Sequence, residues 1–368
     1  MKQTASGERM DYTLLITCVG LTLFGILMVY SASPVAAYGK YGDSAFFVKK
    51  QIVWAVLALI AGFVFYKRKT VDIKKMMMPG LVTSIILLFA VHIPHLGHKV
   101  GGATRWFNLG PLSFQPFELV KIFYVIYLAE IFSTESFTVL KRFIRTAMVT
   151  GIIILGLIFQ KDLGAVMIIV SIYLAILIIV GSYGKMLIGL LPVLVMLVVA
   201  LIKFEPFRLK RFMAFLDPWK DPLGSGYQSI QSFIAVGSGG IFGVGFSNSQ
   251  QKFLFLPTPH TDYIFSVVAE ELGLIGSVIL LSGFFMVLSR GVFIAINVQD
   301  KFNKFLALGL TLIIITQVCM NVAVSIGLMP TKGTTLPFIS YGGSSLMVAC
   351  VAMGMLLSVS KLAYGRGK

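Results

Sequence analysis

Long apolar stretches recur along almost the whole chain, and they do not alternate with polar residues as the strands of a membrane barrel would. Each stretch is close to the roughly 20 residues that an α-helix needs to cross a hydrocarbon layer. The pattern therefore predicts an all-α polytopic membrane protein with ten transmembrane helices. They are expected near residues 12–33, 51–66, 76–94, 117–132, 146–160, 163–180, 186–204, 264–289, 305–329 and 343–361.

Basic residues indicate how these helices are oriented. An even number of spans places both termini on one side, and the termini and short loops of that side carry more than twice as many Lys and Arg residues as the opposite short loops. Because cytoplasmic loops are enriched in Lys and Arg, both termini are predicted to be cytoplasmic. A large extracytoplasmic loop, about residues 205–262, then connects helices seven and eight of a single membrane domain that spans residues 1–368.

The composition excludes other classes of protein. Hydrophobic residues make up 57% of the chain and charged residues 12%, whereas an average soluble domain has about 25% charged residues. A soluble globular protein and a disordered chain are both excluded. The net charge of +16 is mostly a consequence of topology, so no nucleic-acid partner is predicted. Cys18, Cys319 and Cys350 lie in apolar spans and are expected to pack there rather than form disulfides or bind zinc.

Ionisable residues in or near the spans are the candidate functional residues. A charge at the centre of a membrane helix costs about 2.5–3.5 kcal/mol, so a charge that is retained there usually has a function. The candidates lie mainly at the outer ends of the spans. Arg105 and Trp106 lie in an outer loop that leads to Glu118 and Lys121, which share one helix face. These residues form either an interfacial anchor with an internal ion pair, or a basic and aromatic surface that meets a lipid headgroup.

Two aspartates and a lysine stand out on the same side. Asp162 either caps the sixth helix or holds a charge in an outer cavity. Asp262 either caps the eighth helix or places a carboxylate at the outer membrane surface. Lys332 is a single cation among small and hydroxyl residues, which is typical of an anion-binding turn.

Two other patterns are interpreted as structural. The glycine-rich run 237–245 lacks the features of nucleotide-binding loops, and its glycines are expected to allow close approach to a bulky ligand or a tight turn. The segment before it, 227–236, is expected to be a helix at the membrane interface. His92, His95 and His98 are spaced by three, but Pro94 interrupts any helix that would align them, so interfacial positions are expected rather than metal binding.

These motifs resemble the SEDS family (shape, elongation, division and sporulation), which includes FtsW, RodA and SpoVE. The resemblance covers essentially the whole chain, and the stretch after Lys332 is closer to the FtsW/SpoVE branch than to RodA. Phe117, Lys161 and Thr258 depart from the usual family residues, and none of them is assigned a role. The matching motifs are Gly102–Trp106 with Gln115–Lys121, Asp162–Gly164, Asp217–Trp219 with Asp221–Gly224, His260–Phe265 with Glu270–Gly273, and Lys332–Ser345.

The resemblance implies a peptidoglycan glycosyltransferase that polymerises lipid II at the outer face of the bacterial cytoplasmic membrane, in division, sporulation or shape maintenance. Such a reaction needs a base for the attacking hydroxyl and cations for the departing undecaprenyl pyrophosphate. Asp262 is the predicted base. Arg105, Lys121 and Lys332 are predicted to bind the headgroup anion, and Trp106 to pack on the sugar or lipid. The other predicted substrate-binding residues are Glu118, Asp162, His260, Ser340, Tyr341 and Ser344.

The resemblance also implies partners, while the chemistry leaves a cofactor open and the charged residues in the spans leave another function open. One possibility is that a divalent cation, Mg²⁺ or Mn²⁺, bridges the pyrophosphate and a carboxylate. No metal-ligand spacing in the sequence indicates such a cation. The implied partners are lipid II, the undecaprenyl-pyrophosphate-linked glycan, a class B penicillin-binding transpeptidase and other divisome or elongasome membrane proteins, with the division septum as location. A lipid II flippase and a non-catalytic division scaffold stay open as alternatives. The clustering of motifs on the outer side and the lack of a convincing internal repeat favour the enzyme.

Overall fold

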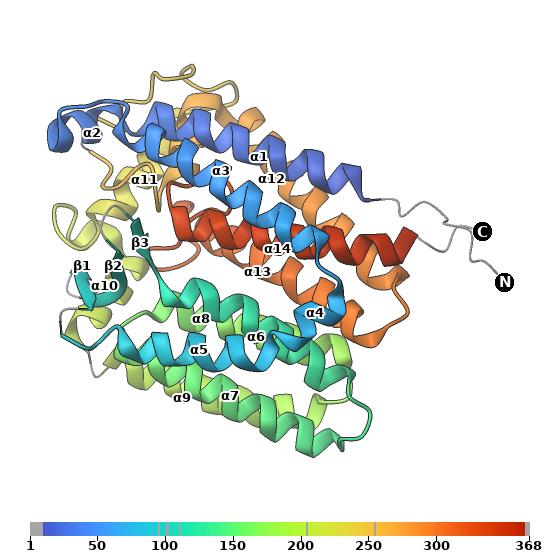
Figure 1. Ribbon diagram of the computed structural model, residues 1–368. Coiled ribbons are helices and arrows are strands. Elements are labelled where there is room, and N and C mark those ends of the chain that lie inside the picture. The colour runs from blue at the N-terminus through green and yellow to red at the C-terminus, as the bar shows by residue number, and fades with distance from the viewer. Residues whose placement is uncertain are drawn as a thin grey trace.

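The computed structural model describes residues 10–94, 96–100, 103–109, 112–203, 205–253 and 255–364. These residues form a helical bundle with a small sheet at one end (Figure 1). The long helices are α1 (Tyr12–Ala32), α3 (Phe46–Lys67), α5 (Met77–Ala90), α6 (Pro116–Ser133), α7 (Val139–Phe159), α8 (Leu163–Val180), α9 (Gly184–Lys203), α12 (Ile264–Asn297), α13 (Lys301–Ser325) and α14 (Gly343–Tyr364). The other elements are α2 (Pro34–Tyr41), α4 (Thr70–Lys75), α10 (Pro206–Leu216), the 3-10 helix η1 (Pro218–Lys220), α11 (Tyr227–Ser238), β1 (Gly97–Val100), β2 (Ala103–Leu109) and β3 (Leu112–Phe114).

Each of the ten predicted spans coincides with one long helix of the bundle, which confirms a polytopic helical fold. Within the described residues, eight of these helices are long and apolar enough to cross a membrane. The other two are α5, which has 14 residues, and α6, which carries Glu118, Lys121 and Glu130 within its 18 residues. The full count of ten therefore remains a prediction.

Some helices extend further into basic sequence than the apolar pattern predicts. α7 begins at residue 139 rather than near residue 146, so three basic residues, among them Lys141, lie in its first turns instead of in a loop. Thr138 fixes this start, because its hydroxyl accepts a hydrogen bond from the Lys141 amide. α12 and α13 likewise extend beyond their apolar stretches. Long basic side chains allow this, since their stems can follow the helix while their charged ends reach water.

α14 is the central helix of the bundle. It packs along its length against α3 and also contacts α13, α12 and α6. A Cβ added to Gly62 of α3 would lie 2.6 Å from the Cys350 carbonyl oxygen, and one added to Gly354 would overlap the Gly62 carbonyl. Small residues thus bring the two backbones together, as in other membrane helix pairs. By contrast, α9 lies at the edge of the bundle, and no residue of its apolar stretch is buried.

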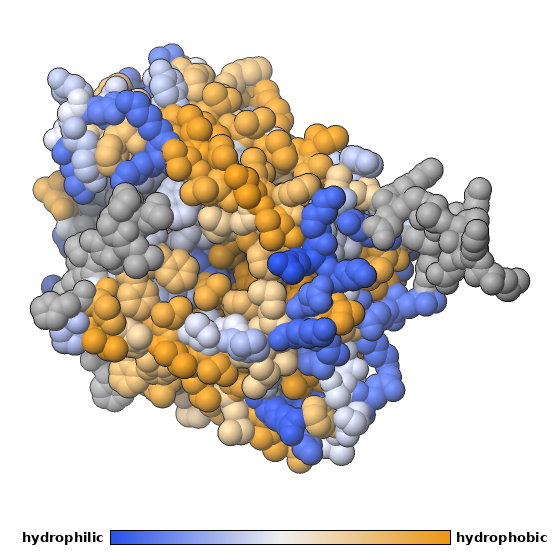
Figure 2. Space-filling model, in the orientation of Figure 1, coloured by the Kyte–Doolittle hydropathy of each residue, from blue (hydrophilic) through white to orange (hydrophobic). Residues whose placement is uncertain are grey.

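The two ends of the bundle differ in structure. The sheet, α10 and α11 lie at one end, on the left of Figure 1. The strands pair antiparallel in the order β1-β2-β3, a sheet that the sequence pattern does not predict. At the other end the start of α1 meets the end of α14, where the Asp11 carboxylate pairs with Arg290 (2.8 Å) and accepts a hydrogen bond from Tyr364 (3.2 Å). Figure 2 shows apolar side chains across the middle of the molecule and hydrophilic ones toward its ends.

The segment between α9 and α12 is largely structured rather than a single long loop. It contains α10, η1 and α11. α11 confirms the predicted helix near 227–236. Ile230 of this helix is buried and Ile234 is exposed, so its apolar face is divided between the protein interior and the surface.

The glycine-rich run 237–245 packs its backbone against a break in α12. Gly273 has φ 66° and ψ −163° there, which interrupts the helix. The Val244 amide donates to the Glu270 carbonyl (3.0 Å), and three further backbone hydrogen bonds join the run to the helix. A Cβ on Gly243 would overlap the Glu271 carbonyl. In this structure the glycines allow two backbones of the chain to approach each other, whereas the sequence suggested either approach to a bulky ligand or a tight turn.

A buried ionic network holds the loop before residue 253 against α12 and α1. The Lys252 ammonium lies 2.9 Å from the Glu271 carboxylate, to which the Ser31 hydroxyl also donates at 2.5 Å. The neighbouring Glu270 accepts a hydrogen bond from the Ser249 hydroxyl (2.5 Å). All five side chains are buried. Both glutamates of the family motif therefore have local structural partners.

Two of the three cysteines are buried as predicted, and among the three spaced histidines the side chain of His92 is described. All three cysteines are free, with Cys18 and Cys350 buried and Cys319 exposed. His92 is exposed and its Nδ1 lies 3.3 Å from a backbone carbonyl oxygen. The prediction for His95 lies outside the described residues, as does the side chain of His98.

Candidate functional site

Asp262 lies two residues before α12, and residues from three other segments surround its carboxylate. Arg105 of β2, Arg211 of α10 and Asp162 at the start of α8 all act on it electrostatically. Burial raises the pKa of Asp262 to about 6, while Arg211 and Arg105 oppose the rise and Asp162 adds to it. The residue nevertheless keeps partial exposure to solvent. An accessible carboxylate whose pKa is close to neutrality is well suited to accept a proton.

The backbone before Asp262 is fixed by the last loop, residues 330–342. The His260 carbonyl accepts a hydrogen bond from the Tyr341 amide (2.8 Å). The Thr261 carbonyl accepts one from the Ser340 hydroxyl (2.6 Å). Three of the predicted site residues, His260, Ser340 and Tyr341, are therefore brought together, and two of them act by holding the segment that carries Asp262.

Asn321 of α13 completes this arrangement. Its Nδ2 donates to the Asp262 carbonyl at 2.9 Å and to the Thr334 carbonyl at 2.7 Å, so both amide protons of a buried side chain are used. Sequence reasoning missed Asn321. The signal that could have found it is the series Gln317, Asn321 and Ser325, which places three polar side chains on one face of an apolar helix.

Arg105 joins β2 to the turn between α7 and α8. Its Nε donates to the Gln160 carbonyl (3.1 Å), and Nη2 donates to the Lys161 carbonyl (2.5 Å). Its Nη1 lies 3.6 Å from the Asp162 carboxylate. Asp162 also caps α8 by accepting a hydrogen bond from the Ala165 amide (3.1 Å). Asp162 therefore caps α8, which confirms one of its two interpretations, and its charge also lies next to Arg105. The outer cavity of the other interpretation stays a prediction.

Lys332 and Gly333 lie beside the two aspartates. A Cβ added to Gly333 would be 3.3 Å from Asp262 Oδ2, and one added to Gly164 would be 3.4 Å from Asp162 Oδ1 and 3.8 Å from the Cβ of Lys332. Burial lowers the pKa of Lys332 to about 8, although Asp162 opposes this shift. The predicted lone cation thus lies in the same cluster as the predicted base.

Arg211 is the second residue that sequence reasoning missed. It comes from α10, its Nη1 donates to the Thr331 carbonyl (3.4 Å), and its charge acts on Asp262. In the sequence it is one of several basic residues in a long connecting segment, and nothing distinguishes it from its neighbours there. Only the packing of α10 brings it to the site.

Uncharged polar and aromatic groups lie next to this cluster. The His260 ring is 4.3 Å from the Phe47 ring and 5.8 Å from the Tyr341 ring, measured between centroids. Burial lowers the pKa of His260 to about 4, so the imidazole is neutral at neutral pH. Within the described structure, His260 Nδ1 and the buried Ser344 hydroxyl have no hydrogen-bond partner. Trp106 is partly buried in β2.

Lys121 and Glu118 form a buried pair that does not join this cluster. The Lys121 ammonium lies 2.8 Å from the Glu118 carboxylate and donates to Gln317 Oε1 at 2.9 Å. Gln317 precedes Asn321 by one turn on α13, so the pair lies about one helical turn deeper in the bundle than the Asp262 carbonyl. In this conformation the Lys121 ammonium forms an ion pair with Glu118. The role of Lys121 in anion binding stays a prediction.

The donor set does not fit a resident divalent cation. Among the described residues, no group of three His, Cys, Asp or Glu side chains lies close enough to hold a metal ion. The two carboxylates of the cluster, Asp162 and Asp262, are accompanied by Arg105, Arg211 and Lys332. Side chains already supply the positive charge there.

The chain is similar to known proteins over nearly its whole length. A curated relative from Trichlorobacter lovleyi, named "Probable peptidoglycan glycosyltransferase FtsW", is 40% identical over 364 residues, which cover 97% of this chain and 96% of the relative. "Stage V sporulation protein E" of Bacillus subtilis is 38% identical over 354 residues, covering 95% of this chain and 97% of that protein.

Solved structures show the same fold. A chain from a peptidoglycan synthase complex, described for its structural coordination of polymerization and crosslinking, superposes with a TM-score of 0.80 at 28% identity, covering 96% of this chain and 98% of that one. The rod shape determining protein RodA of Thermus thermophilus gives a TM-score of 0.72 at 25% identity with the same coverage. The family model for FtsW, RodA and SpoVE, described as cell cycle protein, matches residues 12–364. The chain therefore belongs to the FtsW/RodA/SpoVE family and is most similar in sequence to its FtsW branch.

Proposed function

We propose that the chain is a peptidoglycan glycosyltransferase that polymerises lipid II into glycan strands at the outer face of the cytoplasmic membrane. Curated FtsW relatives bear the name of this activity, and the similarity to them extends over almost the whole chain. The observation that carries the proposal is the accessible Asp262 carboxylate, whose pKa is raised to about 6 in a cluster with Arg105, Arg211 and Lys332.

Asp262 is the general base of the proposed reaction. The 4-hydroxyl oxygen of a lipid II GlcNAc attacks C1 of the MurNAc at the end of a strand that is still linked to undecaprenyl pyrophosphate. The new glycosidic bond forms while the bond from C1 to the pyrophosphate oxygen breaks, and Asp262 accepts the hydroxyl proton. A pKa of about 6 leaves the carboxylate mostly ionised at neutral pH and makes it more basic than an ordinary aspartate.

The departing pyrophosphate needs positive charge rather than a proton. Glycoside hydrolases use two carboxyl groups because the leaving sugar oxygen must be protonated, whereas a pyrophosphate leaves as a stable anion. Arg105, Arg211 and Lys332 supply the charge near the base. Asp162 is then a positioning residue, which orients Arg105 and caps the start of α8.

The remaining site residues position the substrate and the base. Ser340 and Tyr341 hold the segment that carries Asp262. His260 and Ser344 offer uncharged polar atoms to sugar hydroxyls, since each has an atom without a partner within the described structure. Trp106 packs on the sugar or the lipid.

The proposed topology has ten transmembrane helices and cytoplasmic termini in one membrane domain. The excess of Lys and Arg on the side of the termini supports it, and so does the position of the site at the opposite end of the bundle. α6 can cross the membrane because its charges are paired, Glu118 with Lys121 and Glu130 with Lys74 (both 2.8 Å).

A class B penicillin-binding transpeptidase is the proposed partner, because polymerised strands must be crosslinked. The similarity to a chain of a synthase complex that coordinates polymerization and crosslinking supports this assignment. The FtsW relatives support a place at the division septum.

Incubation of the purified chain with lipid II, with and without a cognate transpeptidase, tests the proposed function. Glycan strands resolved on a gel are the expected product. A second arm reconstitutes the chain in vesicles and measures exposure of the lipid II headgroup on the far side. Headgroup transfer without strands would identify a flippase, and neither product would identify a scaffold, so both outcomes would overturn the proposal.

The polymerisation rate is expected to follow a bell-shaped pH curve with limbs near pH 6 and pH 8. Asp262 must be deprotonated, so the rate rises as the pH rises through its pKa of about 6. Lys332 must be protonated, so the rate falls as the pH rises through its pKa of about 8. Initial rates measured between about pH 5 and pH 9 give the curve.

Lys332→Met provides the control for this curve. The substitution should lower the maximal rate about tenfold to a hundredfold, less than the loss of a lone oxyanion donor can cost, because Arg105 and Arg211 remain. It should also remove the alkaline limb and leave the acidic limb in place. An alkaline limb that persists in Lys332→Met would show that Lys332 is not the group that titrates.

A further inference from the structure

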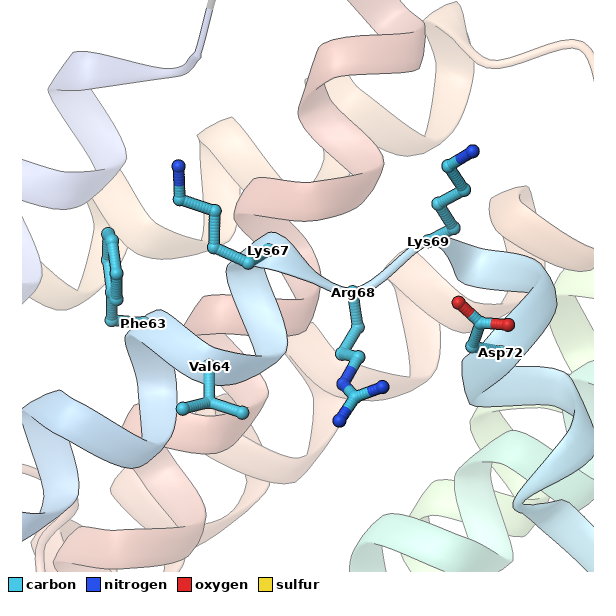
Figure 3. Close-up of a pocket in the computed structure, with 6 residues that line it drawn as sticks. All are labelled: Phe63, Val64, Lys67, Arg68, Lys69 and Asp72. Atoms are coloured by element: carbon cyan, nitrogen blue, oxygen red, sulfur yellow. The ribbon is translucent and has the colours of Figure 1, made fainter.

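A hollow lies at the end of α3 that is farthest from Asp262. It has a volume of about 610 Å³ and is lined by Phe63, Val64, Lys67, Arg68, Lys69 and Asp72 (Figure 3). We call it the α3–α4 pocket, because its lining comes from the last turns of α3, the junction and the first turn of α4. In Figure 3 Val64 and Arg68 project to the same side of the chain, and Lys67 and Lys69 rise from the rim.

The pocket has an unbalanced positive charge. Its lining contains three cations, Lys67, Arg68 and Lys69, but a single carboxylate, Asp72, and none of the three cations forms an ion pair within the part of the chain that the structure describes. Some of the other basic residues at this end of the bundle are paired. They include Lys74 with Glu130, Arg290 with Asp11 and Lys301 with Glu135. The cations of the pocket are therefore available to an anion from outside the chain.

The backbone of the pocket is held in place by the central helix. The Ser358 hydroxyl of α14 donates to the Arg68 carbonyl at 2.7 Å, although Ser358 is itself buried. The Lys361 ammonium lies 3.9 Å from the centre of the Tyr66 ring. Tyr66 comes directly before Lys67, which lines the pocket. The junction between α3 and α4 is thus fixed before any ligand binds, which lowers the entropic cost of binding.

An apolar stripe leads to the pocket along the outside of α3. Its residues recur at helical spacing and all are exposed by 40% or more, which is expected for a surface that contacts lipid chains. Figure 2 shows an apolar band next to the hydrophilic cluster at this end of the molecule. The stripe consists of Ile52, Val53, Val56, Leu57, Ile60, Phe63 and Val64.

We propose that the α3–α4 pocket binds the headgroup of an anionic phospholipid, with one acyl chain along the apolar stripe of α3. Arg68 offers a planar set of donors that matches two phosphate oxygens, and Lys67 and Lys69 add charge. Asp72 accepts a hydrogen bond from a hydroxylated headgroup such as phosphoglycerol. In the proposed topology this lipid comes from the cytoplasmic leaflet, whose negative surface attracts basic residues.

Native mass spectrometry of the full chain in detergent tests the proposal, with dioleoyl phosphatidylglycerol and dioleoyl phosphatidylcholine as probes. The wild-type chain is expected to retain phosphatidylglycerol in preference to phosphatidylcholine. Arg68→Gln combined with Lys69→Gln should weaken phosphatidylglycerol binding about 25-fold, since each cation near an anionic lipid contributes roughly fivefold. Both residues are exposed, and circular dichroism confirms that the variant keeps its helices.

The matched control removes two exposed cations outside the pocket, Lys185→Gln with Lys304→Gln. This control should retain phosphatidylglycerol like the wild type. An equal loss in both double variants would show attraction to overall charge and would overturn the pocket. Displacement of the lipid by millimolar inorganic phosphate would assign the cations to a free phosphate instead. Because the readout is lipid retention, failure here is distinguishable from failure to polymerise lipid II.

Discussion

Replacing Asp262 by Asn is expected to lower the rate of glycan polymerisation by about 10²- to 10⁴-fold, the range that loss of a general base produces. Asn has nearly the same shape, and the contacts that fix this segment go to backbone carbonyls, so His260, Thr261 and Asp262 should keep their positions. What disappears is the proton acceptor whose pKa lies at about 6. Strand synthesis by purified variants from lipid II, followed as initial rates, measures the effect.

Asp162→Asn is the matched control for this substitution. It removes the other carboxylate of the cluster, and Asn caps helices about as well as Asp, so α8 should stay intact. Its loss should be about tenfold or less, because Arg105 keeps its two backbone carbonyl partners. If Asp262→Asn polymerised at the normal rate, or Asp162→Asn lost more activity than Asp262→Asn, Asp262 would not be the base.

Replacing Lys252 by Met is expected to lower the free energy of unfolding by about 3–5 kcal/mol, because it leaves the Glu271 carboxylate buried without its cation. Ser31 still donates to that carboxylate, but a hydroxyl does not replace a charge. A second substitution, Glu271→Gln, should restore much of the loss in the double variant. Unfolding of the purified chain in detergent by a denaturant series provides the measurement.

The pair Lys49 and Asp43 serves as the control for this prediction. It has nearly the same separation, 2.8 Å, but its side chains are 69% and 40% exposed. Lys49→Met should therefore change the free energy of unfolding by about 1 kcal/mol or less. A Lys252→Met variant as stable as Lys49→Met would contradict the view that the buried network holds the loop on α12.

The helices were predictable because a membrane helix is specified by length and local apolarity alone. Their ends were less so. The start of α7 depends on a cap at Thr138, and the length of α12 depends on packing, and neither raises the apolarity of the sequence. The sheet of β1, β2 and β3 could not be predicted, since its strands have as few as three residues and gain their stability by pairing.

Some residues of the cluster could be singled out from the sequence, whereas residues that join it through contacts with distant segments could not. Asp262 and Lys332 stand out because acidic and lone basic residues are scarce at the outer ends of the spans. Asn321 and Arg211 do not, because they join the cluster through contacts with segments distant in the sequence, such as the hydrogen bond from Asn321 to the Asp262 carbonyl, 59 residues away. Lys121 is conspicuous in the sequence but does not join the cluster, because it forms an ion pair with Glu118 on its own helix.

The contact between the glycine-rich run and the broken helix α12 has a consequence for mutational surveys. The glycine-rich run 237–245 forms backbone hydrogen bonds with α12 on both sides of Gly273, where the helix loses its own. Backbone groups rather than side chains therefore stabilise the break. Exchange of the intervening residues Ile241 and Phe242, both exposed, should then be tolerated, while any Cβ at Gly239 or Gly243 meets carbonyl groups of α12. A saturation screen would show a strict glycine requirement that imitates a ligand-binding loop although its origin is steric.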